Sequence, residues 1–368
     1  MKRFALWAAF LLSFQDCFAL EYLENDFRDT NNSLHIRGSF TPKSNQLKLN
    51  VFENDWDVIP TYKKNNVAFG SIYFDVYYNF DTFKIGIFSE ESAEIKLNDG
   101  FVEILYAANN DFNTFLHYST INTKISKTAI SGDANYYKTE GLYVQKLFKL
   151  SKNNYLSAKI KLHYGKNLEK IAVNGQNTQS RFNAKLDYYY SNKNYISKHN
   201  NNNSSSGYGY SIDVEYIYNK EKLYIYAGLF NIESKLYWRG VERMEYSFDS
   251  KTTYRGSDGY NHRRPFGIGK YSGDVNYVQS LPMFYKGSLD YQLNNNFSIG
   301  DNLDGYQSVY FNEVYLTARL YNSRYKVGYM YEAKTFIFAA YFNHFKVEIS
   351  NNFSFSQNVM QAKLHLWF

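Results

Sequence analysis

Long runs of alternating apolar and polar residues are the feature that most constrains the fold of this chain. In the run over residues 67–80, one face is formed by Ala, Gly, Ile, Phe, Val and Tyr, while Ser71, Asp75 and Asn79 lie on the other. The same pattern recurs over residues 154–164, 181–190 and 208–218. Because the side chains of a strand point alternately to two faces, each run predicts a strand with one apolar and one polar face.

Three properties of these strands favour a membrane barrel over a soluble sandwich. The strands reach about 10–14 residues, enough to cross a bilayer at a tilt. Their apolar faces begin and end with Tyr, as an aromatic girdle requires, and aromatic residues make up 20% of a chain whose mean hydropathy is −0.52. Several polar faces also carry full charges, which suits a wet interior better than a packed core. The predicted fold is all-β, a transmembrane antiparallel up-and-down β-barrel of about 16 strands, within a range of roughly 14 to 18.

The N-terminal region is typical of an export signal. Lys2 and Arg3 precede an apolar run over residues 4–14, and small residues before position 20 predict cleavage after Ala19. Residues 1–19 are therefore interpreted as a signal peptide. Its cleavage would remove Cys17, the sole cysteine of the chain. Residues 20–65 are expected to form an irregular segment with a first strand near 33–41, and residues 66–368 the barrel.

The last residues form the most specific pattern. Leu364 and Leu366 face one way, Lys363 and His365 the other, and the chain ends with Phe368. This resembles the C-terminal strand of bacterial outer-membrane barrel proteins, although Leu366 stands where an aromatic residue is more usual. The resemblance implies that Leu364, Leu366 and Phe368 form an assembly signal for the barrel-assembly machinery. It also implies a place in the outer membrane of a Gram-negative bacterium, among lipid and lipopolysaccharide.

Within this class, size and short connections resemble a porin. A barrel of roughly 14 to 18 strands is wide enough to enclose water. The predicted function is passive diffusion of small hydrophilic solutes, with a weak preference for anions or other charged solutes. No enzyme activity, cofactor, metal site or nucleic-acid partner is predicted. A homotrimer is compatible with the sequence.

Charged residues on the polar strand faces are the candidate selectivity residues, because a lumen lined by charge discriminates between ions. A second candidate is the loop over residues 250–274, where arginines beside tyrosines could bind carboxylates or phosphates, or form a constriction. The lumen candidates are Lys159, Lys161, Arg181, Lys185, Arg239, Arg319, Lys326, Asp187, Asp213 and Glu215, and the loop candidates are Arg255, Arg263, Arg264 and Tyr260.

Three other functions stay open. A plugged channel for hydrophobic substrates would need residues 20–65 to supply a small plug. A surface adhesin would use the Tyr- and Arg-rich outer loops. An outer-membrane hydrolase is less favoured, because His163 and His199 have no serine at a family spacing. The Asp55-Trp56-Asp57 fragment likewise has no matching Asp-x-His.

Overall fold

The computed structural model describes most of the barrel and leaves several segments aside. The described residues are 32–44, 66–80, 82–102, 128–178, 181–192, 205–251, 253–255, 257, 260–263, 267–306, 309–321, 323–332, 335–342, 345–351 and 360–367. The predicted signal peptide, most of residues 20–65 and the terminal Phe368 lie outside them. Within the described part, no helix is both long and apolar enough to cross a membrane.

The described chain is almost entirely β-strand, with a single helical turn over residues 99–102. The strands are β1 (Ser33–Phe40), β2 (Lys43–Ser44), β3 (Asn66–Phe80), β4 (Phe83–Leu97), β5 (Thr128–Lys149), β6 (Asn154–Thr178), β7 (Arg181–Tyr190), β8 (Ser206–Lys220), β9 (Leu223–Asp249), β10 (Thr253–Arg255), β11 (Asn261–Arg263), β12 (Gly267–Gln279), β13 (Phe284–Gln292), β14 (Phe297–Tyr306), β15 (Val309–Leu320), β16 (Ser323–Met330), β17 (Thr335–Tyr341), β18 (Phe345–Asn351) and β19 (Met360–Trp367).

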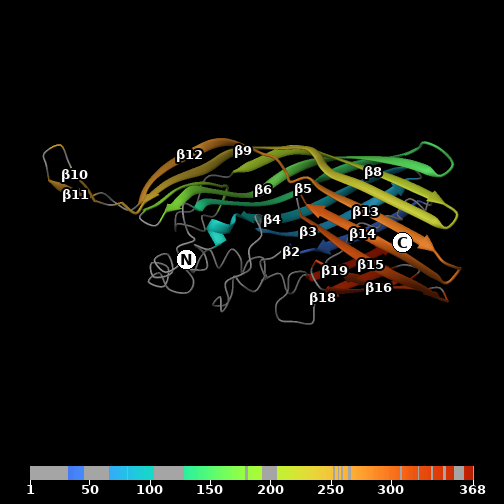
Figure 1. The fold of residues 1–368 in the computed structure, drawn as a ribbon. Coiled ribbons are helices and arrows are strands. Elements are labelled where there is room, and N and C mark those ends of the chain that lie inside the picture. Colours follow the sequence, from blue (N-terminus) through green and yellow to red (C-terminus); the bar gives the residue numbers. More distant parts are fainter. Residues whose placement is uncertain are drawn as a thin grey trace.

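These strands close into an antiparallel barrel (Figure 1). Closure occurs where β19 pairs with β1, in a register that sets Ile36 opposite Leu366. The barrel has 14 strands, because three of its passes are each divided into two segments. The divided passes are β1 with β2, β7 with β8, and β12 with β13.

The strand count lies at the lower end of the predicted range, two below the expected 16. The difference has a physical reason. Residues 191–207 and Pro282 look like connections between strands in the sequence. However, β7 and β8 both lie between β6 and β9, and β12 and β13 both pair with β9. Each supposed connection is therefore an interruption within one pass.

The outward face is apolar. Ile87, Leu142 and Ile160 are 56%, 58% and 54% exposed although they lie in the middle of paired strands. The outward face of β15 runs from Tyr310 to Leu320; at about 3.3 Å per residue and a tilt of about 40°, that is roughly 25 Å along the barrel axis. This height matches the hydrocarbon thickness that an outer-membrane barrel spans. Exposed rings border it, at the turn end Phe80, Phe83, Phe148, Tyr291, Phe297 and Phe345, and at the opposite end Tyr164, Tyr208, Tyr237, Tyr310 and Phe336.

The wall is uneven in height. Strands β4 to β7, β9 and β12 extend well beyond the ends of β13 to β19, so that one side of the barrel rises above the other (Figure 1). Residues on this extension form a buried apolar cluster that includes Ile95, Tyr136, Ile171, Tyr188 and Met244. Strand β12 pairs only with β9 among the described strands, so its second edge has no partner strand in that part of the chain.

The interior of the barrel is packed with side chains. Tyr77, Tyr143, Phe230 and Trp238 are each at most 1% exposed. The ring of Trp238 lies against Gly165 on β6 and Gly207 on β8, where an added Cβ would come within 2.5 and 2.8 Å of the indole. Glycine at these positions therefore allows the indole to lie flat on the inner wall.

A candidate solute cavity beside a break in the wall

The ladder between β9 and the β12–β13 pass is broken at mid-height. Residues 280–283 are not in a strand, and Pro282 lacks the N–H that a ladder needs. On β9, Asn231 has a positive φ of 53°, which bends the strand at the same level. Side chains hold the two segments together here: Asn231 Nδ2 donates to the Pro282 carbonyl at 3.1 Å, and Ser234 Oγ to the Leu281 carbonyl at 3.1 Å.

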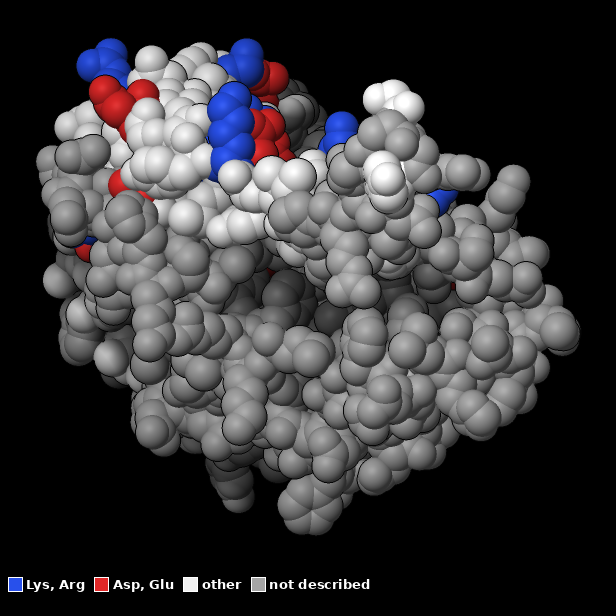
Figure 2. Space-filling model, turned by 90° about the vertical axis from the view of Figure 1, so that its left-hand side faces the viewer, with Lys and Arg blue, Asp and Glu red and all other residues white. Residues whose placement is uncertain are grey.

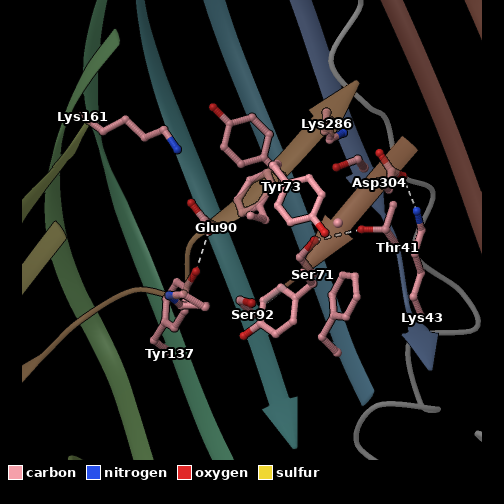
Figure 3. A pocket seen from close by; sticks show the side chains of 17 residues that line it. Thr41, Lys43, Ser71, Tyr73, Glu90, Ser92, Tyr137, Lys161, Lys286 and Asp304 are labelled. Atoms are coloured by element: carbon pink, nitrogen blue, oxygen red, sulfur yellow. Dashed lines mark hydrogen bonds and ion pairs between the residues drawn. The ribbon is translucent and has the colours of Figure 1, made fainter. Parts of the chain in front are cut away.

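A cavity of about 100 Å³ lies in the barrel beside this break (Figure 3). One side is formed by residues of β1 to β6, and the other by Pro282 and residues of β13 and β14. The rings of Phe69 and Tyr306 are stacked with their centroids 4.7 Å apart, and Phe284 stacks on Phe230 at 4.6 Å. Six aromatic residues line the cavity, namely Phe69, Tyr73, Tyr137, Phe284, Tyr285 and Tyr306.

Three charged residues of the lining form ion pairs. Lys43 forms an ion pair with Asp304, and Lys161 Nζ lies 3.1 Å from Asp213 Oδ2. Thr41 Oγ1 and Ser71 Oγ are 2.9 Å apart. This pairing leaves the aromatic rings as the main surface available to a solute.

Elsewhere on the inner wall, a buried ion pair joins the neighbouring strands β1 and β3. Arg37 Nε donates to Asp75 Oδ1 at 2.9 Å, and Asp75 Oδ2 accepts a bond of 2.8 Å from the Tyr143 hydroxyl. The Arg37 guanidinium also lies 4.3 Å from the centroid of the Tyr77 ring. Asp75 is completely buried and Arg37 is 2% exposed, so these inner-wall charges are shielded from water.

A second buried network lies on the wall formed by β15 to β19. Lys326 Nζ is 2.7 Å from Glu313 Oε1 and 3.7 Å from Glu348 Oε2, and Lys363 contacts the other oxygen of Glu348. All four side chains are at most 6% exposed. The charges on this part of the inner wall are therefore also paired and buried.

Five of the ten predicted lumen residues are buried and packed. Lys159, whose Nζ lies 4.9 Å from the Tyr143 ring centroid, and Lys161 are 1% and 2% exposed. Lys326 and Asp213 are in the ion pairs described above, and Glu215 accepts a 3.0 Å bond from Gln145 Nε2. Their placement on the inner face agrees with the sequence pattern. Their role in selectivity stays a prediction.

The other predicted lumen residues lie elsewhere. Lys185 and Asp187 are on the extension above the barrel, and exposed Arg319 borders a polar pocket at the turn end. Arg239 is on the face of β9 opposite to buried Trp238, so its assignment to the lumen is wrong. The pattern misled because apolar Leu236 and Trp238 pack inward here. The side chain of Arg181 lies outside the described residues.

Charges of both signs lie side by side on the tall end of the barrel (Figure 2). Arg243 makes two bonds of 2.8 Å to the Asp187 carboxylate and one contact of 2.9 Å to Glu245, and Lys170 pairs with Asp133. A mixed surface of this kind gives no strong field for ions of one sign. The described residues at this end therefore give no support to a preference for anions.

The predicted constriction loop is not folded into the barrel. Strands β10 and β11 form a small hairpin that projects away from the tall end (Figure 1). Tyr260 at its tip is 74% exposed. Arg264 and the side chains of Arg255 and Arg263 lie outside the described residues. Of the predicted assembly signal, Leu364 and Leu366 lie on the outward face of β19. They pair with residues of β1 and β18.

His163, the nearest fragment of a hydrolase site, does contact a serine. Its Nε2 lies 2.9 Å from Ser211 Oγ and its Nδ1 lies 3.2 Å from Thr139 Oγ1. Ser211 is completely buried, so a substrate cannot reach its hydroxyl. The Asp55-Trp56-Asp57 fragment lies outside the described residues. Among the residues described, no group of three or more His, Cys, Asp or Glu is placed to hold a metal ion.

Sequence reasoning missed the residues of the cavity and of the wall break. Pro282 did carry a usable signal, because a proline inside a strand pattern is confined to edges and bulges. The cavity residues Tyr73, Glu90 and Tyr137 carry no local mark. They come from the neighbouring strands β3, β4 and β5 and meet only when these strands pair.

Comparisons with known proteins give general similarity of shape. Neither protein-family models nor curated proteins match the chain. Among solved structures, a mutant of the TodX monoaromatic hydrocarbon channel has 8% identity and a TM-score of 0.46, covering 95% of this chain and 94% of its own. The toluene transporter TbuX of Ralstonia pickettii has 8% identity and a TM-score of 0.32 over 96% and 94%. The outer-membrane protease OmpT of Escherichia coli has 9% identity and a TM-score of 0.26 over 92% and 98%.

At such scores, none of these similarities decides the function. The assignment of the compartment rests on the barrel itself. Its ring of strands closes through β19 and β1, and its exposed apolar band is roughly 25 Å high between two sets of exposed rings. This chain is an outer-membrane β-barrel protein.

Proposed function

We propose that this barrel is a channel for small hydrophobic solutes, which bind in the aromatic cavity and leave sideways through the wall break into the membrane. The observation that carries this proposal is the position of the cavity, which Pro282 and Phe284 border at the level where the ladder is broken. Transfer of a hydrophobic solute into a water-filled outlet is unfavourable. An opening at membrane height would instead release it directly into lipid.

The packed lumen supports this function over a general porin. A porin of this size needs inner-wall charges that face water, whereas the two ion-pair networks described above are buried. The function proposed here was the alternative to the porin in the sequence analysis. That alternative would need a plug from residues 20–65; most of these residues lie outside the described part of the chain, and Arg37 among them belongs to the wall strand β1.

The test is to lock the wall break. Ser234 and Leu281 are joined by two bonds, since Leu281 N also donates to Ser234 Oγ at 2.9 Å. A disulfide in the variant Ser234→Cys/Leu281→Cys would hold the two segments together. The matched control is Ala227→Cys/Gly287→Cys, a directly paired position in the intact ladder between β9 and β13.

Uptake of labelled toluene by cells expressing each variant is measured before and after reduction. We expect the oxidised Ser234→Cys/Leu281→Cys variant to take up toluene several-fold more slowly, with recovery on reduction, and the control to be unaffected by oxidation. Liposomes containing the wild-type barrel should swell little in arabinose. Rapid swelling in arabinose, together with toluene uptake that ignores the lock, would overturn the proposal in favour of a porin.

A further inference from the structure

Glu90 is a buried acid on the inner wall beside the cavity. It lies on β4, opposite Tyr73 of β3 and Thr139 of β5, and is 7% exposed. Its Oε1 accepts a hydrogen bond of 2.7 Å from the Tyr137 hydroxyl. Its Oε2 is buried and has no hydrogen-bond partner within the described part of the chain. A buried acceptor without a donor is unfavourable, so this oxygen calls for a donor from a ligand.

Other polar groups of the lining already have hydrogen-bond or ion-pair partners. Thr41 and Ser71 bind each other, Lys43 binds Asp304, and Ser92 Oγ donates to the Gly70 carbonyl at 3.4 Å. Apart from Glu90 Oε2, the lining atom without a partner among the described residues is the Tyr306 hydroxyl. A hydroxyl can donate or accept, whereas a carboxylate oxygen can only accept. Glu90 therefore sets the chemistry of the site.

The cavity also limits the size and shape of a ligand. Its volume of about 100 Å³ is of the same order as a cavity of roughly 150 Å³ that holds benzene. Figure 3 shows Glu90 and Tyr73 on neighbouring strands at the cavity, with Tyr137 bonded to Glu90 from the strand beyond. A single aromatic ring can pack on such faces in the offset or edge-on arrangements that rings prefer.

We infer that the cavity selects small aromatic molecules that carry one hydrogen-bond donor, such as phenols, with the ring against the aromatic lining and the hydroxyl donating to Glu90 Oε2. This inference rests on the proposed function and specifies its substrate class. A ring without a donor, such as toluene, would leave the carboxylate oxygen unsatisfied. A site built around a buried polar group discriminates against a ligand that cannot bond to it.

Binding of phenol and of toluene to the purified barrel in detergent tests this inference. Wild type should bind phenol about tenfold more tightly than toluene, because one hydrogen bond to a charged group is worth about that factor. Glu90→Leu should remove the preference by weakening phenol binding and leaving toluene binding unchanged or stronger. Glu90→Gln keeps an oxygen acceptor and should retain part of the preference.

The matched control is Glu215→Gln, a buried lumen acid outside the cavity lining whose Oε2 accepts from Gln145. It should bind both ligands as wild type does, and the heat-modifiable gel shift of each variant reports that the barrel has folded. If wild type binds phenol no more tightly than toluene, and Glu90→Leu binds them in the same ratio, the inference is overturned. The proposed channel function would not be affected by that result. Failure of either ligand to bind or enter would instead count against the proposed function.

Discussion

The ion pair between Arg37 and Asp75 offers the most quantitative test of how the lumen is stabilised. Asp75 is completely buried and Arg37 nearly so, with the guanidinium 2.9 Å from Oδ1. In Arg37→Met, the carboxylate keeps only the hydroxyls of Tyr143 at 2.8 Å and Tyr73 at 3.3 Å. Removing one partner of a buried pair typically costs about 3–5 kcal/mol, because the other charge stays buried without compensation. We expect a loss in that range, reduced by the two hydroxyl bonds.

Arg243→Met is the control for this variant, since Arg243 binds Asp187 in similar geometry. Their side chains are 31% and 36% exposed, so screening by water should limit the loss to about 1 kcal/mol or less. The assay is guanidinium unfolding of the barrel refolded into lipid vesicles, followed by intrinsic fluorescence. Arg37→Met/Asp75→Leu should recover most of the stability, because it removes both buried charges. Equal losses in Arg37→Met and Arg243→Met would refute the reasoning.

Three further outcomes are expected. Gly207→Val should displace the Trp238 indole, shift its emission to the red and destabilise the barrel by about 1–3 kcal/mol, whereas Gly287→Val, with no neighbouring atom closer than 3.6 Å to its Cβ, should do neither. Deleting residues 253–263 should leave toluene uptake unchanged, because the β10–β11 hairpin projects away from the barrel; a change in uptake would restore the idea of a constriction there. Removing Phe368 should reduce the amount of heat-modifiable barrel in outer-membrane fractions, and an unchanged amount would contradict its role in assembly.

The sequence predicted the outer surface of the barrel better than its interior. Lipid rewards apolar side chains on every second position, so the alternation that includes Ile160 and Leu162 identifies the lipid face directly. The lumen imposes no such rule. A charged residue such as Lys161 or Asp75 can face water or form a packed ion pair. Which of the two occurs depends on a partner on another strand, as Arg37 is for Asp75.

The wall break was hidden for a different reason. Pro282 and Asn231 are ordinary turn residues, and a turn and an interruption within one pass look alike in a single sequence. Only the pairing of β12 and β13 with the same strand β9 separates the two cases. The same ambiguity at residues 191–207 contributes to the excess in the expected strand number.

Closure of the barrel through β1 and β19 has a consequence for how the protein must fold. His35 Nδ1 and His365 Nε2 meet at 3.0 Å across this seam although they are 330 positions apart. Joining segments so distant costs about 5 kcal/mol of chain entropy, growing with the logarithm of the separation. Every other pairing in the barrel can form between neighbouring passes as the chain advances, but this one waits for the last strand. Until then both edges stay exposed, so an unfinished barrel is open to aggregation or to templating by another protein.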